Sequence, residues 1–104
     1  MSPFGLKNKN IDGINGVFKQ HPEIEKAIIY GSRANGSYRN GSDIDLTLTG
    51  EGLNLTKLFK IENELDDLLL PYKIDLSLLH EIKNSDLLKE IETAGVLFYS
   101  KTKF

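Results

Sequence analysis

The stretch GSRANGSYRNGSDIDL, residues 31–46, decides the fold and the chemistry to expect from this chain. It opens with a turn, Gly31-Ser32, and closes with two aspartates, Asp43 and Asp45, that are separated by one residue. A glycine lets the backbone come close to a phosphate, and the amides and hydroxyl of such a turn can donate hydrogen bonds to phosphate oxygens. Carboxylate oxygens are ligands that Mg²⁺ prefers. The stretch therefore combines the parts that a phosphoryl- or nucleotidyl-transfer site needs.

The end of this stretch alternates between polar and apolar side chains, which predicts a half-buried strand over residues 43–48. Asp43 and Asp45 then point to the same side, with α-carbons about 6.5–6.8 Å apart. Carboxylates at this spacing can converge on two metal ions that lie about 3.5–4 Å apart. Aspartate is a poor strand former, so its presence at both positions needs a reason, which metal binding supplies.

A third acidic residue, Asp75, lies in a second alternating run, YKIDLSLL, which predicts a strand over residues 73–79. Asp75 falls on the polar face of that strand. If the two strands are neighbours, the three carboxylates share one patch, where their repulsion raises their pKa values and favours a bound cation. Mg²⁺ suits such a patch because it takes oxygen ligands, retains some water and completes its shell with substrate phosphates.

The segment between the turn and the first of these strands, residues 31–41, is rich in Gly, Ser and Asn and is expected to be a loop with one helical turn. Its glycine spacing matches neither a P-loop nor a G-x-G-x-x-G fingerprint. Arg33 is expected either to contact a phosphate or a partner, or to be a solvated surface residue. Ser42 is expected to orient the start of the strand through its backbone or hydroxyl. Tyr30 is expected to pack beside the loop, and Tyr38 is a candidate for partner contact or self-modification.

Hydrophobic periodicity predicts the elements around this loop. Helices are predicted over residues 11–20 and 55–69, and a third runs from an N-cap at Ser85 to a stop at Gly95. Further strands are predicted over residues 24–30 and 96–99. This order of elements predicts an α/β (α+β) fold, a small mixed β-sheet with helices on one face.

Length and composition limit the domain number, the kinds of metal site and the partners that this chain can have. With 104 residues, the chain fits a single domain over residues 1–104, too small for a separate substrate domain. The absence of cysteine excludes disulfides and thiolate zinc sites, and His21 and His80 lack metal-like spacing and are expected at the surface or at caps. A formal charge of −2 argues against direct binding of nucleic acid but leaves a nucleotide possible. The absence of cysteine predicts a cytoplasmic location. No apolar run has the length of a membrane span, and the N-terminus lacks the apolar core of a signal peptide.

A set of residues matches one known family residue for residue: Gly31, Ser32, Ala34, Gly36, Ser42, Asp43, Asp45, Leu46 and Asp75. In this set the chain resembles the nucleotidyltransferase superfamily that includes DNA polymerase beta, and most closely its smallest members, the minimal nucleotidyltransferase (MNT) proteins. The resemblance implies the polymerase beta-like fold and transfer of NMP, most often AMP from ATP, to a hydroxyl acceptor with release of pyrophosphate.

The resemblance also implies roles for single residues. The Gly31-Ser32 turn, with Arg33 and Ser42 nearby, would hold the triphosphate. Asp43 and Asp45 would bind two Mg²⁺ ions. Asp75 would bind the catalytic metal and help to activate the incoming hydroxyl.

MNT proteins commonly pair with an all-helical HEPN protein, so the resemblance implies such a partner. In some pairs the MNT is an antitoxin that adenylylates a tyrosine of a HEPN ribonuclease, and in others the helical protein is like a substrate-binding subunit. Two alternatives stay open. The chain could be a binding module that neutralises its partner by contact alone, or a small-molecule nucleotidyltransferase of the antibiotic-modifying kind. The base preference, the acceptor and the homo- or hetero-oligomeric state are left open by the sequence.

Overall fold

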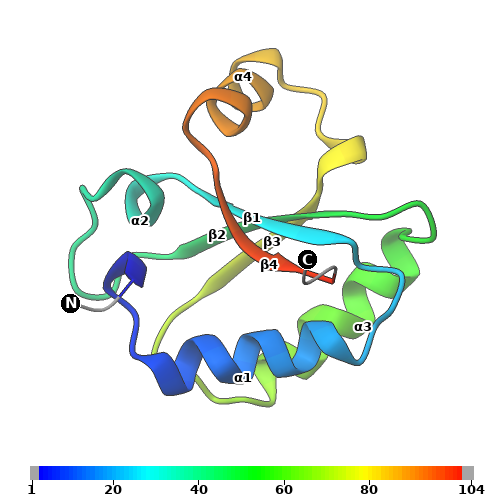
Figure 1. Ribbon diagram of the computed structural model, residues 1–104, viewed down its shortest axis with the longest axis horizontal. Coiled ribbons are helices and arrows are strands. Elements are labelled where there is room, and N and C mark those ends of the chain that lie inside the picture. Colours follow the sequence, from blue (N-terminus) through cyan, green and yellow to red (C-terminus); the bar gives the residue numbers. More distant parts are fainter. Residues whose placement is uncertain (1–2, 102–104) are drawn as a thin grey trace.

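The computed structural model describes residues 3–101 as one four-stranded sheet flanked by helices (Figure 1). The strands are β1 (Lys26–Tyr30), β2 (Ile44–Thr49), β3 (Ile74–Leu78) and β4 (Val96–Ser100). The α-helices are α1 (Asn8–Lys19), α2 (Ser32–Asn35), α3 (Leu55–Asp66) and α4 (Ser85–Ala94), and the short 3₁₀ helices are η1 (Pro3–Gly5) and η2 (Leu79–Glu81). The order of elements predicted from periodicity is confirmed.

The sheet is mixed, with the strand order β3-β2-β1-β4. β1 pairs antiparallel with both β2 and β4, whereas β2 and β3 are parallel and are joined through α3. A parallel pair needs a long crossover connection, and α3 supplies it. β2 therefore lies inside the sheet, with a hydrogen-bonded neighbour on each side.

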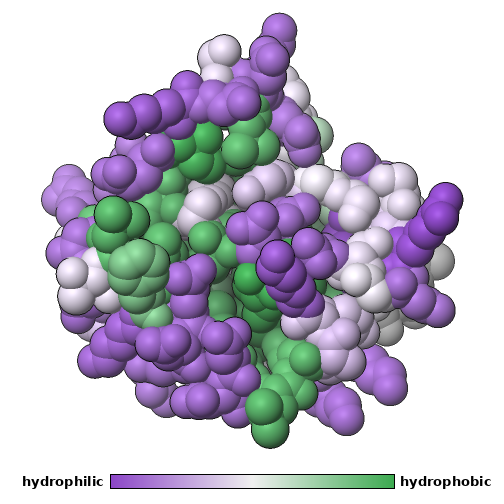
Figure 2. Space-filling view, turned by 180° about the vertical axis from the view of Figure 1, so that it is seen from behind, coloured by the Kyte–Doolittle hydropathy of each residue, from purple (hydrophilic) through white to green (hydrophobic). Residues whose placement is uncertain are grey.

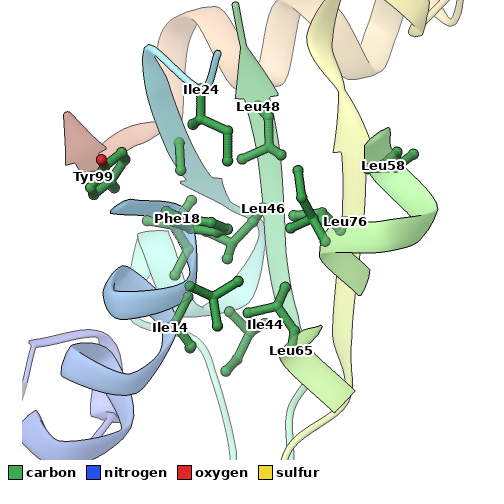
Figure 3. Packing of buried hydrophobic residues seen from close by; sticks show 14 of the residues in the cluster. Ile14, Phe18, Ile24, Ile44, Leu46, Leu48, Leu58, Leu65, Leu76 and Tyr99 are labelled. Atoms are coloured by element: carbon green, nitrogen blue, oxygen red, sulfur yellow. The ribbon is translucent and has the colours of Figure 1, made fainter. Parts of the chain in front are cut away.

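The hydrophobic core lies between the sheet and the two long helices, α1 and α3, which cover the same face (Figures 1 and 3). Ile44, Leu46 and Leu48 of β2 are fully buried there. Phe18 of α1 packs against Tyr99 of β4, with ring centroids 5.5 Å apart. Because side chains alternate along a strand, burial of this set turns the intervening polar residues to the opposite face.

That opposite face is only partly covered, by α4 (Figure 1). Ile91 of α4 is buried, and a Cβ added at Gly95 would lie 2.8 Å from Ile28 of β1. A groove of about 580 Å³ runs between α4 and the sheet, lined in part by Leu88 and Leu97. The prediction of helices on one face therefore holds for α1 and α3, whereas α4 lies on the other side. The physical reason is that Ile28 and Leu97 offer the apolar stripe of α4 a second surface to pack against.

The surface carries apolar side chains between polar ones. Seen from behind, hydrophobic areas lie between hydrophilic ones on this side of the molecule (Figure 2). Among residues 3–101, five large apolar residues are exposed: Leu55, Phe59, Leu69, Val96 and Leu97. Within residues 3–101, no helix is both long enough and apolar enough to cross a membrane.

Helix boundaries differ from the predictions in α1, α3 and α4. α1 begins at Asn8 rather than at residue 11, and α3 ends at Asp66 rather than at residue 69. The predicted N-cap at Ser85 is wrong, because Ser85 is already the first helical residue of α4. Asn84 is the cap, and its side-chain oxygen accepts hydrogen bonds from the amides of Asp86 and Leu87 at 2.9 and 3.1 Å. Asparagine is as good an N-cap as serine, so the residue type could not separate the two positions.

Replacement of this cap is expected to weaken α4. Asn84→Ala leaves two amides of the first turn without their side-chain acceptor and should lower the free energy of unfolding by about 1 kcal/mol. Ser85→Ala is the matched control and should change it by less than about 0.5 kcal/mol. Urea denaturation of both variants tests this, and a larger loss in Ser85→Ala would show that the cap is assigned to the wrong residue.

Candidate functional site

Three polar side chains form one row across the open face of the sheet. Asp45 of β2 pairs in register with Tyr30 of β1 on one side and with Asp75 of β3 on the other. Neighbouring strands lie about 4.7–4.9 Å apart, so the two carboxylates start from adjacent backbone positions. The condition set from the sequence, that the two acidic strands are neighbours, is therefore confirmed. Asp43 lies just before β2, and both it and Asp75 are exposed, whereas Asp45 is half-buried.

The loop approaches this row at Gly31. Gly31 follows β1 directly and has φ 75° and ψ −153°, a conformation that is essentially restricted to glycine. A Cβ at this position would lie 2.5 Å from the Oδ2 atom of Asp45. The backbone of the loop and the Asp45 carboxylate thus meet in a space that only glycine leaves free.

The remainder of the loop is short and ordered by its own hydrogen bonds. The single turn α2 follows Gly31, and the Gly31 carbonyl accepts hydrogen bonds from the amides of Ala34 and Asn35, both at 3.1 Å. The expected loop with one helical turn is thereby confirmed. Ser32 is the first residue of that turn and comes two residues after Tyr30, which belongs to the row.

Ser42 orders the start of β2 in both of the ways considered from the sequence. Its hydroxyl accepts a hydrogen bond from the amide of Arg39 at 2.8 Å, which closes the end of the loop. Its carbonyl accepts one from Nε of Arg33 at 3.0 Å. These contacts fix the backbone immediately before Asp43. A contact of Ser42 with a nucleotide stays a prediction.

Arg33 is not the solvated surface residue that the sequence allowed as one alternative. Its side chain is 2% exposed. Besides Ser42, Nη1 donates to the carbonyl of Phe4 at 2.9 Å, and the guanidinium lies over the rings of Tyr38 and Tyr72. The contacts with two carbonyls and two rings explain the burial, which the polar surroundings of Arg33 in the sequence did not signal. They also assign Tyr38 to packing against Arg33.

The site is a region of concentrated negative charge. Burial raises the pKa of the Asp45 carboxyl above its usual value, and the carboxylates of Asp75, Asp43 and Glu90 raise it further. Burial also raises the pKa of the Tyr30 phenol, and the charges of Asp45, Asp75 and Glu90 act in the same direction. Glu90 lies on α4, and nothing in its sequence context distinguished it from a solvated helix residue. Its place beside the site follows from the side of the sheet that α4 occupies.

This donor set fits a divalent cation. Within residues 3–101 the ion pairs involve Glu23, Glu64 and Glu81, and none of them neutralises Asp43, Asp45 or Asp75. In the same part of the chain no three or more His, Cys, Asp or Glu side chains already form a group that could hold a metal ion. Mg²⁺ needs no such cage, because it uses one or two carboxylates and takes its other ligands from water and substrate phosphates. A cation would relieve the repulsion that raises the pKa of Asp45.

The two histidines lie apart from this site. His21 is buried rather than at the surface, and its Nε2 atom lies 2.7 Å from Oε1 of Glu64 on α3. His80 is exposed beside Glu81, as expected. Tyr30 is buried and directly precedes Gly31, and its packing beside the loop stays a prediction.

Comparison with known proteins gives a family and a set of structural neighbours. The family model described as "Polymerase beta, Nucleotidyltransferase" matches residues 12–104. A search of curated proteins found no match. A structure described as a toxin-antitoxin with AMP-PNP is 20% identical with a TM-score of 0.71, covering 88% of this chain and 73% of that one. A chain of a structure described as a tri-AMPylated Shewanella oneidensis HEPN toxin in complex with MNT antitoxin is 18% identical with a TM-score of 0.66, covering 91% of this chain and 73% of that one. At these identities the structural likeness establishes the fold.

Substitution of Gly31 tests the contact between the loop and Asp45. Gly31→Ala forces a side chain into a glycine-only conformation, which should cost about 1–3 kcal/mol of stability, and it displaces the Asp45 carboxylate. Mn²⁺ affinity, measured by calorimetry, should therefore fall together with the free energy of unfolding. The matched control is Gly16→Ala on α1, where an added Cβ has nothing within 4 Å. In this control the free energy of unfolding should rise by about 0.5–1 kcal/mol, and the Mn²⁺ affinity should be unchanged. Unchanged stability and metal affinity in Gly31→Ala would contradict the geometry.

Neutralisation of Asp45 tests the charge cluster through pH dependence. A carboxyl whose pKa is raised by folding destabilises the folded state above that pKa, and the penalty disappears as the pH falls through the unfolded value of about 3.9. Asp45→Asn without metal should therefore raise Tm by roughly 2–4 °C at pH 7, since the partly exposed site is screened by solvent. The gain should vanish near pH 3.5. Asp12→Asn, an exposed position on α1, is the control and should not change Tm. A lower Tm in Asp45→Asn at pH 7 would mean that Asp45 has a stabilising partner.

Proposed function

Because the chain belongs to the polymerase beta nucleotidyltransferase family, we propose that it is an Mg²⁺-dependent enzyme that transfers AMP from ATP to a protein hydroxyl. The proposed acceptor is a tyrosine of a HEPN-type helical partner, and the proposed role is that of the antitoxin in a toxin–antitoxin pair. The single observation that carries the catalytic part is the pairing of Asp45 with Asp75, with Gly31 directly against Asp45.

We propose the following division of tasks among the site residues. The backbone of Gly31 and the hydroxyl of Ser32 bind the triphosphate beside the acidic row. Asp43 and Asp45 would hold two Mg²⁺ ions, and the chemistry that these ions would supply is neutralisation of charge on the phosphates and the leaving pyrophosphate. Asp75, exposed at the edge strand β3, would also bind the catalytic metal, orient the acceptor hydroxyl and take its proton.

The reaction is a direct displacement. The acceptor oxygen bonds to the α-phosphorus of ATP, the bond from that phosphorus to the bridging oxygen breaks, and pyrophosphate leaves with the electron pair. The proton of the acceptor passes to Asp75. Positioning of the two reactants and neutralisation of phosphate charge account for most of the rate enhancement expected of such a site.

The open form of the site supports a protein acceptor. Asp43 and Asp75 are exposed, so a side chain presented by another protein can reach them. The groove of about 580 Å³ beside α4 includes none of the three aspartates among its lining residues. A small-molecule nucleotidyltransferase would need an enclosed acceptor pocket next to the carboxylates, which argues for the protein acceptor over an antibiotic-like one.

The structural neighbours support the choice of nucleotide and partner. One neighbour is described with the ATP analogue AMP-PNP, and another as an MNT antitoxin in complex with a HEPN toxin that carries three AMP groups. Those statements concern the neighbours. Their likeness to this chain makes AMP and a HEPN-type protein the first substrates to test.

A labelling experiment tests the proposed activity. The chain is incubated with a HEPN-type helical protein, Mg²⁺ and α-labelled ATP, and label is expected on a tyrosine of the partner. Asp43→Asn and Asp45→Asn should each lower the rate at least about 100-fold, because each removes a metal ligand, whereas Asp12→Asn should not. Chelation of the metal should abolish labelling in the unsubstituted protein.

The same variants separate transfer from neutralisation by contact. If the antitoxin acts by AMP transfer, the double variant Asp43→Asn with Asp45→Asn loses protection against the partner. Protection that persists in this variant would favour the contact-only alternative. Absence of labelled partner together with absence of ATP binding would overturn the proposed enzyme activity.

A further inference from the structure

We propose that Arg33 is a positioning residue. Its buried side chain holds the loop that begins at Gly31 in place against β2 and β3. The inference goes beyond the proposed function, on which it rests for the identity of the reaction. It assigns to Arg33 a role in geometry, in place of the phosphate contact considered from the sequence.

The guanidinium connects four segments of the chain. Arg33 itself lies in α2, two residues after Gly31. Its Nε donates to the carbonyl of Ser42, which directly precedes Asp43, at 3.0 Å. Its Nη1 donates to the carbonyl of Phe4 in η1 at 2.9 Å. Its Cζ atom lies over the ring of Tyr72, 4.8 Å from the ring centroid, and Tyr72 comes three residues before Asp75.

The fourth segment is the loop itself, through Tyr38. The Tyr38 ring lies 5.2 Å from Cζ of Arg33 and occupies the space next to Gly5, where an added Cβ would lie 2.2 Å from the ring. One side chain thus contacts the segments that carry or precede Gly31, Asp43 and Asp75. Movement of this side chain would change the distance between the loop and both acidic strands.

The contacts of the guanidinium are what allow Arg33 to be buried. A charged group that is 2% exposed is costly unless its donors are bonded. Among the ion pairs of residues 3–101, none involves Arg33, so its charge is met by carbonyl oxygens and ring faces. A planar guanidinium can bond two carbonyls in its plane and stack on rings above it, whereas an ammonium group cannot do both. Lysine at this position would therefore retain the charge but would not hold the connected segments in their positions.

Kinetics of four variants test the proposal. Arg33→Lys and Arg33→Met should both lower kcat for AMP transfer at least about 10-fold at saturating ATP, after correction for the folded fraction, because misplacement of reacting groups lowers kcat. Arg39→Met, an exposed arginine in the same loop, is the matched control and should stay within twofold. In Arg33→Ala, methylguanidinium should restore at least part of the lost kcat, and methylammonium should not.

A readout that needs no activity separates this proposal from the proposed function. In ¹H–¹⁵N NMR spectra, Arg33→Lys should shift the amide signals of Gly31, Asp43 and Asp75 together, and Arg39→Met should leave Gly31 and Asp75 unshifted. If the unsubstituted protein transfers no AMP but these shifts appear, the proposed function fails and the positioning role stands. If Arg33→Lys retains kcat within twofold, or the three signals do not shift, the positioning role is overturned.

A second pair of variants covers the case in which Arg33 variants do not fold. Tyr72→Leu removes one of the two rings on which the guanidinium stacks, whereas Tyr72→Phe retains the ring. Tyr72→Leu should lower kcat severalfold and shift the Asp43 and Asp75 amides, and Tyr72→Phe should do neither. Equal behaviour of the two variants would overturn the proposal.

Discussion

The burial of Ile44, Leu46 and Leu48 on one face of β2 is the constraint on which the site depends. These residues pack against α1 and α3, and because side chains alternate along a strand, Asp45 must project from the other face. A slip of one residue would exchange the two faces and bury the carboxylate in the core. The most apolar part of the fold therefore positions its most polar part. Pairing of β2 with β1 and β3 then sets Tyr30 and Asp75 on either side of Asp45.

Without a bound cation, the site that results is energetically unfavourable in the folded protein. Burial and three neighbouring carboxylates raise the pKa of Asp45, because both effects make its ionised form less favourable in the folded protein. Gly31 adds a conformation that other residues seldom adopt. Both features lie where the proposed function requires a cation and a polyphosphate to bind. The core on the other face supplies the stability that offsets these costs, which is why one small domain can hold such a site.

Arg33 shows a second way in which the fold supports the site. Its guanidinium contacts backbone and rings from segments that are far apart in the sequence, Phe4, Ser42 and Tyr72. A charged residue within a run of Gly, Ser and Asn looks like surface from the sequence. Only the convergence of η1, the end of the loop and the start of β3 around one side chain makes it buried. The place of α4 has a similar origin, because its apolar stripe would fit either face of the sheet. Which face it covers decides that Glu90 lies beside the acidic row.

The sequence by itself determined the elements, their order and the three aspartates of the candidate site. It could do so because alternation with period two and helical periodicity are local properties, set by a few neighbouring residues. The resemblance carried by residues 31–46 likewise pointed to the family that the family model confirms. Tertiary structure alone decided that Asp45 and Asp75 are direct neighbours, that Gly31 touches Asp45, that Arg33 is buried and that Glu90 approaches the site. Each of these depends on which strands pair and which faces are covered, and those choices arise from packing between segments distant in the sequence.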